Sequence, residues 1–264
     1  MPTADPTARV LLTGASQGIG KAILLELARC GHFVLGVSRT QPEVLVDPAR
    51  SSESDHIAWK PLDLSNADAV AQFAASLEQM PIRVLILCAV DYGANKRHPA
   101  SRTSAHEWQQ VIATNCVGQC LLVSCLLPKL VANPPGIIIN ISSDVALLPA
   151  PGRAAYAASK AGLHAMLRAV AAEHSVDDLR IYQLIPTFQL LTTGIRRRRP
   201  VGFDFSSYGD PAVIAQVVRQ ILASSEDSME PGTYLVRRDG FLIAYPEATH
   251  FENQEDRTRI GVKP

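Results

Sequence analysis

Short runs of Val, Ile and Leu alternate with longer segments of helical periodicity along most of the chain. The apolar runs predict seven strands: Arg9–Thr13, Phe33–Ser38, Ile57–Lys60, Arg83–Cys88, Ile137–Ser142, Arg180–Pro186 and Tyr234–Val236. Apolar residues at three- and four-residue spacing predict five helices: Gly18–Cys30, Asn66–Glu78, Ser104–Val131, Arg153–His174 and Pro211–Ala223. Strands that are continuously apolar are buried on both faces, which is typical of a parallel sheet.

This alternation predicts an α/β fold, a Rossmann-type doubly wound sheet of about seven parallel strands flanked by helices on both faces. The composition, 47% hydrophobic and 19% charged, supports a sizeable core and excludes a disordered chain. No linker-like segment divides residues 1–240, so we expect them to form a single domain. Residues 241–264 are expected to be a polar tail, packed on this domain or extending from it.

Charge and cysteine content limit the partners and the compartment. The chain has 25 Lys and Arg against 25 Asp and Glu, so no overall charge favours nucleic acid or an anionic membrane. The cysteines have no C-x-x-C spacing, and no His or Asp completes a metal site beside Cys116 and Cys120. Met1–Ala8 lacks the features of a signal peptide, and Val117–Leu127 is too short to span a bilayer. We therefore expect a cytoplasmic protein without a metal.

A glycine-rich turn joins the first strand to the first helix. Its glycines are Gly14, Gly18 and Gly20, in the spacing G-x-x-x-G-x-G. Glycines here permit a sharp turn, close approach of a pyrophosphate and tight helix packing, and the helix N-terminus offers free N–H groups to phosphates. We expect the turn to bind a dinucleotide; the alternative is a tight packing turn. The residues expected at the phosphates are Gly14, Ser16, Gln17, Gly18, Ile19 and Gly20.

The end of the second strand indicates which dinucleotide is bound. A site for NAD usually has Asp or Glu there, which accepts from the ribose 2′-OH. This chain has Ser38 and Arg39, and its first acid, Glu43, follows Pro42. A guanidinium suits a 2′-phosphate, so NADP(H) is favoured over NAD; the alternative is an arginine that merely enters solvent.

A serine, a tyrosine and a lysine follow the fifth strand. Ser143 ends that strand, and Tyr156 and Lys160 lie four residues apart on one face of the next helix. An ammonium near a phenol lowers its pKa toward the range useful in general acid–base catalysis. Ser143 would hydrogen-bond and polarise a substrate oxygen. An ordinary amphipathic helix face is the alternative reading of the Tyr–Lys pair.

Together these motifs resemble the short-chain dehydrogenase/reductases, in their single-domain, NADP-preferring type. The resemblance extends from about Arg9 to Gly240, and it rests on Thr13-Gly-Ala-Ser-Gln-Gly-Ile-Gly20, Asp63-Leu64, Asn115, Ser143 and Tyr156-x-x-x-Lys160. It implies a redox step between a carbonyl and an alcohol on a small organic substrate. It also implies a homodimer or homotetramer, paired through the helices Ser104–Val131 and Arg153–His174.

The resemblance also implies a role for individual residues. Tyr156 would be the general acid or base, and Lys160 would lower its pKa and bind the nicotinamide ribose. Asn115 would hold a water that links Lys160 to solvent. Asp63 would contact the adenine. Further cofactor contacts are implied for Leu64, Ala89, Pro186 and Thr187.

Two segments depart from the family pattern. The usual Asn-Asn-Ala-Gly after the fourth strand is Leu87-Cys-Ala-Val90 here, and the usual Pro-Gly after the sixth strand is Pro186-Thr187. These departures support one alternative function, a catalytically silent NADP(H)-binding regulator or sensor. A second alternative is a non-redox reaction on the same fold, such as dehydration or epimerisation.

Three loops are expected to shape the substrate pocket: Asp91–Ser101, Asp144–Arg153 and Gln189–Gly209. The last contains Arg196–Arg199, which we expect to be a solvated run; the alternative is an anionic substrate or a cofactor phosphate nearby. It also contains aromatic residues that could form an apolar lid or pack on their own domain. These are Phe203, Phe205 and Tyr208, together with Phe188 just before them.

Overall fold

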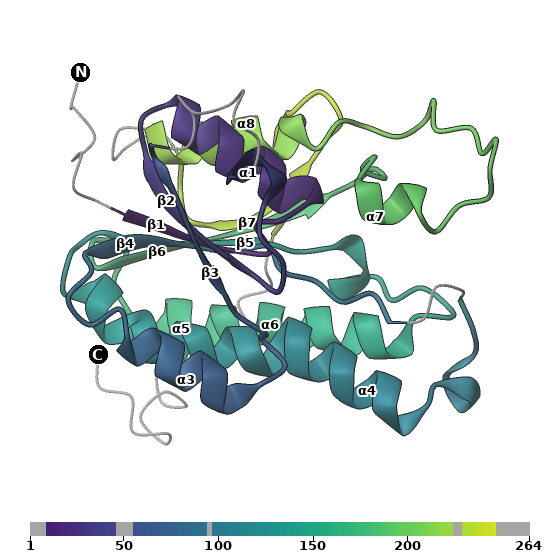
Figure 1. The fold of residues 1–264 in the computed structure, drawn as a ribbon, viewed down its shortest axis with the longest axis horizontal. Helices are drawn as coiled ribbons and strands as arrows, with labels where there is room; N and C mark the ends of the chain where they lie inside the picture. The colour runs from purple at the N-terminus through teal and green to yellow at the C-terminus, as the bar shows by residue number, and fades with distance from the viewer. Residues whose placement is uncertain (1–8, 46–54, 94–96, 224–228, 247–264) are drawn as a thin grey trace.

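The computed structural model describes residues 9–45, 55–93, 97–223 and 229–246. Their strands form one sheet in the order β3-β2-β1-β4-β5-β6-β7-β8 (Figure 1). The strands are β1 (Arg9–Thr13), β2 (Phe33–Ser38), β3 (Ile57–Pro61), β4 (Ile82–Leu87), β5 (Gly136–Ile141), β6 (Leu179–Pro186), β7 (Gly232–Val236) and β8 (Leu242–Ala244). The first seven are parallel, which confirms the predicted doubly wound sheet.

The eighth strand corrects the sequence analysis. Leu242–Ala244 was expected to belong to a polar tail, but it pairs antiparallel with β7, with Leu235 opposite Ile243. The turn Arg237–Gly240 allows this return, since the Arg237 N–H donates to the Phe241 carbonyl and the Gly240 N–H to the Arg237 carbonyl. Residues 247–264 of the predicted tail lie outside the described residues.

Helices cover both faces of the sheet (Figure 1). Helices α1 (Gly18–Arg29) and α8 (Ala212–Ala223) pack together on one face, and α3 (Ala67–Ala75), α5 (Gly118–Val131) and α6 (Ala154–Glu173) cover the other. Alternating residues of β1 serve the two cores: Leu12 packs with the α1 and α8 side, and Leu11 packs with the α3, α5 and α6 side. This is the burial that continuous apolar strands predict.

The predicted helix Ser104–Val131 has an interruption. It begins as α4 (Ala105–Ile112), passes through one π-helical segment (Ala113–Val117) and continues as α5. Single π-helical turns inside α-helices are frequent at functional sites. This one contains Asn115, which is completely buried.

The same run corrects the expectation about membrane spans. Within the described residues, Ala105–Val131 is one helical run that is long and apolar enough to cross a membrane by length and composition alone. The segment Val117–Leu127, which the sequence analysis judged too short to span a bilayer, is therefore only part of a longer apolar helical run. Some side chains of this run, such as Leu122 and Leu126, are buried in the core between α5 and the sheet.

The topology creates a crevice between β1 and β4. The connection from β1 to β2 crosses one face of the sheet through α1, whereas that from β3 to β4 crosses the opposite face through α3. Ligands of doubly wound sheets bind at such a reversal of strand order, beyond the carboxyl ends of the strands. The ends of β1 and β4 are therefore where the site should lie.

Candidate active site

The turn after β1 is shaped by two close backbone approaches. Gly14 has φ +73°, and a Cβ added to it would lie 2.7 Å from the Ala89 Cα. A Cβ on Gly20 would lie 2.2 Å from the Gly14 carbonyl oxygen. The N-cap residue of α1, Gln17, makes no side-chain capping hydrogen bond. The first N–H groups of α1 are therefore left for a ligand, as phosphate-binding turns require.

A cleft of about 600 Å³ opens above this turn. Most residues predicted to bind a cofactor line it: Gly14, Ser16, Gln17, Gly18, Ile19, Gly20, Ser38, Arg39, Asp63, Leu64 and Ala89. Four others do not line it: Tyr156, Lys160, Pro186 and Thr187. The cleft is therefore built by the carboxyl ends of β1, β2 and β4 and by the segment after β3.

Arg39 and Asp63 both line the cleft and interact electrostatically. Burial opposes ionisation of Asp63, but hydrogen bonds from the Ser65 N–H and hydroxyl, with the Arg39 charge, hold its pKa below the ordinary value. The Arg39 side chain is exposed at the end of β2. The Ser38 hydroxyl donates to the Thr40 carbonyl and accepts from the Trp59 indole, so these contacts orient the loop that carries Arg39.

Side chains from other elements hold the segment Leu87–Val90, which departs from the family pattern. The N–H groups of Cys88 and Ala89 donate to the Thr13 hydroxyl at 3.0 and 3.1 Å. Gln119 of α5, which is buried, donates to the Ala89 carbonyl at 3.2 Å. The segment lacks the asparagine and glycine usual in the family, but these hydrogen bonds still anchor it through its backbone. Sequence reasoning missed Gln119; its polarity inside an otherwise apolar helix was the available signal.

Asn115 braces the next residue of the same segment. Its Oδ1 accepts from the Asp91 N–H at 2.6 Å, and its Nδ2 donates to the Asp91 carbonyl and to the Ser159 hydroxyl at 3.0 Å. The π-helical turn places this amide between the end of β4 and α6. These contacts give Asn115 a positioning role. Its implied role as a water ligand stays a prediction.

The segment after β6 closes the cleft from the other side. Thr192 caps the short helix α7 (Thr193–Arg196), accepting from the Ile195 N–H at 3.2 Å, and its side chain faces Gly18. The cleft residues that sequence reasoning did not assign include Thr192, Thr193, Gly194, Arg197 and Arg198. Thr187 lies apart from them, because its N–H and hydroxyl both donate to the Val236 carbonyl.

Tyr156 lies in the wall of a second hollow of about 270 Å³. Its side chain is 6% exposed, and its ring centroid is 5.2 Å from that of Tyr92. Burial, and then the neighbouring Tyr92, raise the pKa of Tyr156, against the opposing effects of a hydrogen bond with Ser143 and the Arg153 charge. The phenol is therefore held in its protonated form.

Lys160 lies one turn along α6, and it is fully buried. Its Nζ donates to the Ile141 carbonyl at 3.0 Å. Burial lowers the pKa of Lys160 to about 8, while Cys88 acts in the opposite direction. Burial raises the pKa of Tyr156, and the lowering of that pKa by Lys160 that the sequence suggested stays a prediction.

Ser143 and Asp144 stand at the end of β5. The Ser143 hydroxyl donates to the Asp144 carboxylate at 2.9 Å and also has the hydrogen bond with Tyr156. The Asp144 carboxylate accepts from the Val145 N–H at 2.9 Å as well. The structure thus brings Ser143 and Tyr156 together as the sequence predicted, with Asp144 as an additional acceptor.

The predicted apolar lid is absent from both hollows. Phe203, Phe205 and Tyr208 pack on one another, with ring centroids 5.0 to 6.1 Å apart, and neither hollow is lined by them. Phe188 packs against the core on the α1 and α8 side. Of the four aromatic residues, Phe188 thus follows the alternative reading of packing on the domain, and the other three form a cluster of their own.

Comparison with known proteins agrees with this geometry. The sequence profile of the short chain dehydrogenase family matches residues 8–199. The 3-oxoacyl-[acyl-carrier-protein] reductase FabG of Rickettsia bellii is 31% identical over 243 residues, which cover 88% of this chain and 96% of that protein. An uncharacterized short-chain type dehydrogenase/reductase of Sinorhizobium fredii, y4vI, is 29% identical over 96% of this chain. This chain spans about half of that relative, 47% of its length.

A solved structure is similar over the same extent. The crystal structure of a metagenomic short-chain oxidoreductase in complex with NADP has a TM-score of 0.70 and 29% identity, covering 88% of this chain and 96% of that chain. The family profile extends from β1 to the loop after α7, and thus includes both hollows. This chain belongs to the short chain dehydrogenase family, a family of oxidoreductases.

Proposed function

We propose that this protein is an NADP(H)-dependent oxidoreductase that interconverts a carbonyl and an alcohol on a small organic substrate, with Tyr156 as the proton donor or acceptor. The observation that carries the proposal is the junction of the two hollows. Tyr92 and Arg198 line both the cleft above the glycine turn and the hollow that contains Tyr156. A dinucleotide in the cleft would therefore end beside the phenol.

The residues of the cleft fit such a dinucleotide. The open N-terminus of α1 suits its pyrophosphate, and Arg39 and Asp63 line the same cleft as Tyr92 and Arg198. A guanidinium at the end of β2 favours a 2′-phosphate over a 2′-OH. The similar metagenomic structure is a complex with NADP, which supports the same choice here.

The side chains divide the remaining chemistry between them. The bound nicotinamide would supply or accept the hydride. Tyr156 would donate its proton to the carbonyl oxygen, and Ser143 would hydrogen-bond that same oxygen. The phenol is protonated at neutral pH, as a proton donor to a carbonyl oxygen must be, and burial raises its pKa further. Lys160 would contact the nicotinamide ribose, and Asn115 would keep the end of β4 in place.

The alternative of a silent NADP(H)-binding regulator predicts cofactor binding without turnover. It drew on the departures at Leu87–Val90 and Pro186-Thr187. The backbone anchors at Thr13 and Gln119 weaken the first of these arguments. A cytoplasmic location and a homodimer or homotetramer stay predictions, as does the single domain 1–240.

The first experiment is a titration of the purified protein with NADPH and with NADH, followed by nicotinamide fluorescence. We expect tight binding of NADPH and weak binding of NADH. NADPH oxidation is then followed with a panel of aldehydes and ketones, and stoichiometric alcohol formation supports the oxidoreductase. Binding without turnover of any member would favour the regulator, and failure to bind either nucleotide would exclude both readings.

A further inference from the structure

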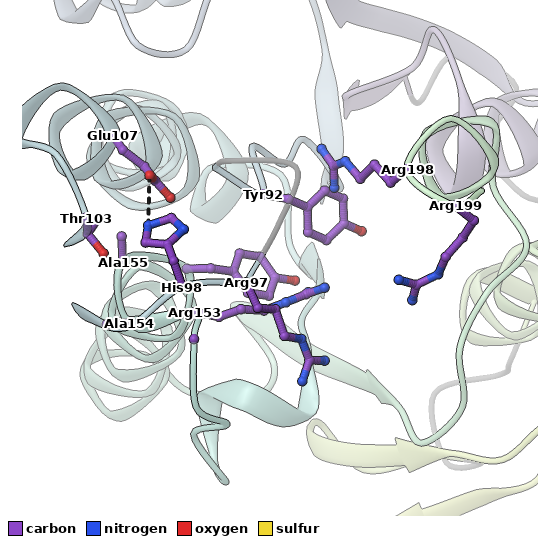
Figure 2. A pocket seen from close by; sticks show the side chains of 12 residues that line it. Tyr92, Arg97, His98, Thr103, Glu107, Arg153, Ala154, Ala155, Arg198 and Arg199 are labelled. Atoms are coloured by element: carbon purple, nitrogen blue, oxygen red, sulfur yellow. Dashed lines mark ion pairs between the residues drawn. The ribbon is translucent and has the colours of Figure 1, made fainter. Parts of the chain in front are cut away.

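Four arginines converge on the hollow beside Tyr156. They are Arg97, Arg153, Arg198 and Arg199, here called the arginine cluster. Figure 2 shows Arg97 and Arg153 approaching from one side of the hollow and Arg198 and Arg199 from the other, the side of α7. Only half of the expected solvated run is solvated: Arg196 and Arg197 are exposed, whereas Arg198 and Arg199 are half-buried.

Aromatic side chains hold three of these guanidinium groups, those of Arg153, Arg198 and Arg199, in place. The Arg198 Cζ lies 4.5 Å from the centroid of Tyr92, and the Arg153 Cζ lies 5.9 Å from that of Tyr156. The Arg199 Nη2 donates to the Tyr208 hydroxyl at 2.9 Å. Rings and a neutral hydroxyl orient the cations and leave their charge uncompensated.

Acidic partners do not neutralise the cluster. Within the described part of the chain, no ion pair involves any of its four members. Glu107 is the acidic residue in the lining of this hollow, and its Oε2 pairs with the His98 Nε2 at 3.2 Å. The hollow is thus a concentration of positive charge in a chain whose net charge is zero.

Arg97 is exposed, whereas the other three arginines are half-buried. Like charges that are partly withdrawn from water disfavour the folded state unless an anion joins them. Burial, and then the charge of Arg97, lower the pKa of Arg153, and Arg198 acts in the same direction. A carboxylate or phosphate among these groups would relieve both the repulsion and the unpaired donors. Planar guanidinium groups bind such oxyanions bidentately.

The cofactor does not account for the whole cluster. Arg198 lines both hollows, so a cofactor phosphate could use it. Arg97 and Arg153 line the hollow of Tyr156 and not the cleft. Any oxyanion that they bind therefore belongs to the molecule that meets Tyr156.

We infer that the substrate carries, besides its carbonyl, an anionic group, a carboxylate or a phosphate, which the arginine cluster binds beside Tyr156. This inference rests on the proposed function and names its substrate class. The carbonyl oxygen would face Tyr156 and Ser143, and the oxyanion would lie toward Arg97 and Arg153. Neutral carbonyl compounds of the same size would be poorer substrates.

The test compares one aldehyde scaffold in three charge states. The NADPH-loaded protein is given 4-carboxybenzaldehyde, 4-formylphenyl phosphate and the neutral methyl 4-formylbenzoate. We expect kcat/KM for one or both anions to exceed that for the ester about tenfold or more, as for a charge-assisted contact. This advantage should shrink as NaCl is raised, because salt screens charged groups. The better anion identifies the oxyanion source.

Two variants assign the preference to the cluster. Arg97→Gln and Arg153→Gln should reduce the anion-to-ester ratio, and Arg153→Lys should restore part of it. A variant that only disturbed proton transfer by Tyr156 would lower kcat/KM equally for the anions and the ester, and would leave their ratio unchanged. Arg196→Gln is the matched control, since Arg196 is exposed, carries the same charge and lines neither hollow. Its ratio should equal that of the unchanged protein.

A binding arm keeps the inference testable without turnover. Calorimetry with benzoate, phenyl phosphate and benzamide measures anion preference with NADPH present and absent. Equal affinity for benzamide and both anions, or an ester that is reduced as well as the anions, would overturn the inference while the proposed function stands. If NADPH does not bind, the proposed function fails, and binding of benzoate that depends on Arg97 and Arg153 still supports the anion site.

Discussion

The two adjoining hollows are built from different parts of the chain. The cleft above Gly14 and Gly20 is shaped chiefly by backbone, within a few residues of the β1–α1 turn. The hollow beside Tyr156 is shaped by side chains from three loops and from α4 and α6. The loops are those that the sequence indicated; their arginines at 196–199 were expected to be solvated, with a nearby anionic substrate or cofactor phosphate as the alternative.

This difference distinguishes the backbone features that bind a common cofactor from the side chains that select a substrate. Backbone N–H groups at a helix N-terminus recognise any phosphate, and they need only glycines at set positions. Side chains on loops recognise one substrate class, and they can change without disturbing the sheet. A dinucleotide site that persists beside a variable substrate site is the expected outcome. The following changes test that division.

The largest effect is expected from Tyr156→Phe, which removes the proton donor from the second hollow and leaves the cleft intact. We expect turnover to fall by about 10²- to 10⁴-fold, the usual contribution of a general acid. Binding of NADPH, measured by fluorescence, should be unchanged. Tyr182→Phe removes a buried hydroxyl that donates to the Met229 carbonyl, away from both hollows, and should retain turnover. Full activity of Tyr156→Phe would dismiss the general acid.

Gly14→Ala tests the backbone geometry of the cleft. Its φ of +73° strains any other residue, and its Cβ would meet the Ala89 backbone at 2.7 Å. We expect a loss of about 3 kcal/mol in the free energy of unfolding, from left-handed strain plus overpacking. Gly31→Ala is the matched control, with φ +83° and nothing within 4 Å, and should lose only the strain component. Equal losses in urea unfolding would show that the close approach to β4 is unimportant.

Lys160→Met tests the buried amine on α6, one turn after Tyr156. Because the pKa of Lys160 is lowered from 10.5 to about 8, the unfolded chain binds more protons at this site between these values. The free energy of unfolding therefore rises with pH through that window. Below about pH 8 the destabilisation caused by the buried charge of Lys160 is fully present. Lys160→Met should therefore be more stable at pH 7 by about 1–3 kcal/mol. The cost of leaving the Ile141 carbonyl without its hydrogen bond reduces this gain.

This gain should vanish above the unfolded pKa of the lysine, near pH 10.5. Urea unfolding of both proteins at pH 7, 9 and 10.5 gives the difference at each pH. A constant difference would mean that Lys160 is charged throughout, held by its contact with the Ile141 carbonyl.

Arg39→Gln gives the smallest effect and sharpens the assignment of the cleft. Loss of one guanidinium at a 2′-phosphate should weaken NADPH about tenfold and leave NADH within about twofold. Lys60→Gln, an equal charge change at the exposed end of β3 outside the cleft, should change neither affinity. If both nucleotides weaken equally, Arg39 does not contact the 2′-phosphate.

Much of the fold was predictable because local patterns carried it. The predicted β1 and β2 coincide with the observed strands, since both are short apolar runs between turn residues. The antiparallel β8, Leu242–Ala244, was missed although its residues are apolar, because only three residues form it and they lie at the exposed edge of the sheet. The π-helical turn at Asn115 was missed because apolar periodicity does not report a local change in helix pitch.

The site divides in the same way. The amino-acid sequence alone determined the sheet, the phosphate-binding turn and the placement of Tyr156 one helical turn before Lys160, because each depends on neighbours within a few residues. Tertiary structure decided the rest. The Thr13 and Gln119 anchors of β4, the raised pKa of Tyr156 and the meeting of Arg97, Arg153 and Arg198 depend on contacts between residues distant in the chain. Burial and charge act through space, so no local spacing could report them.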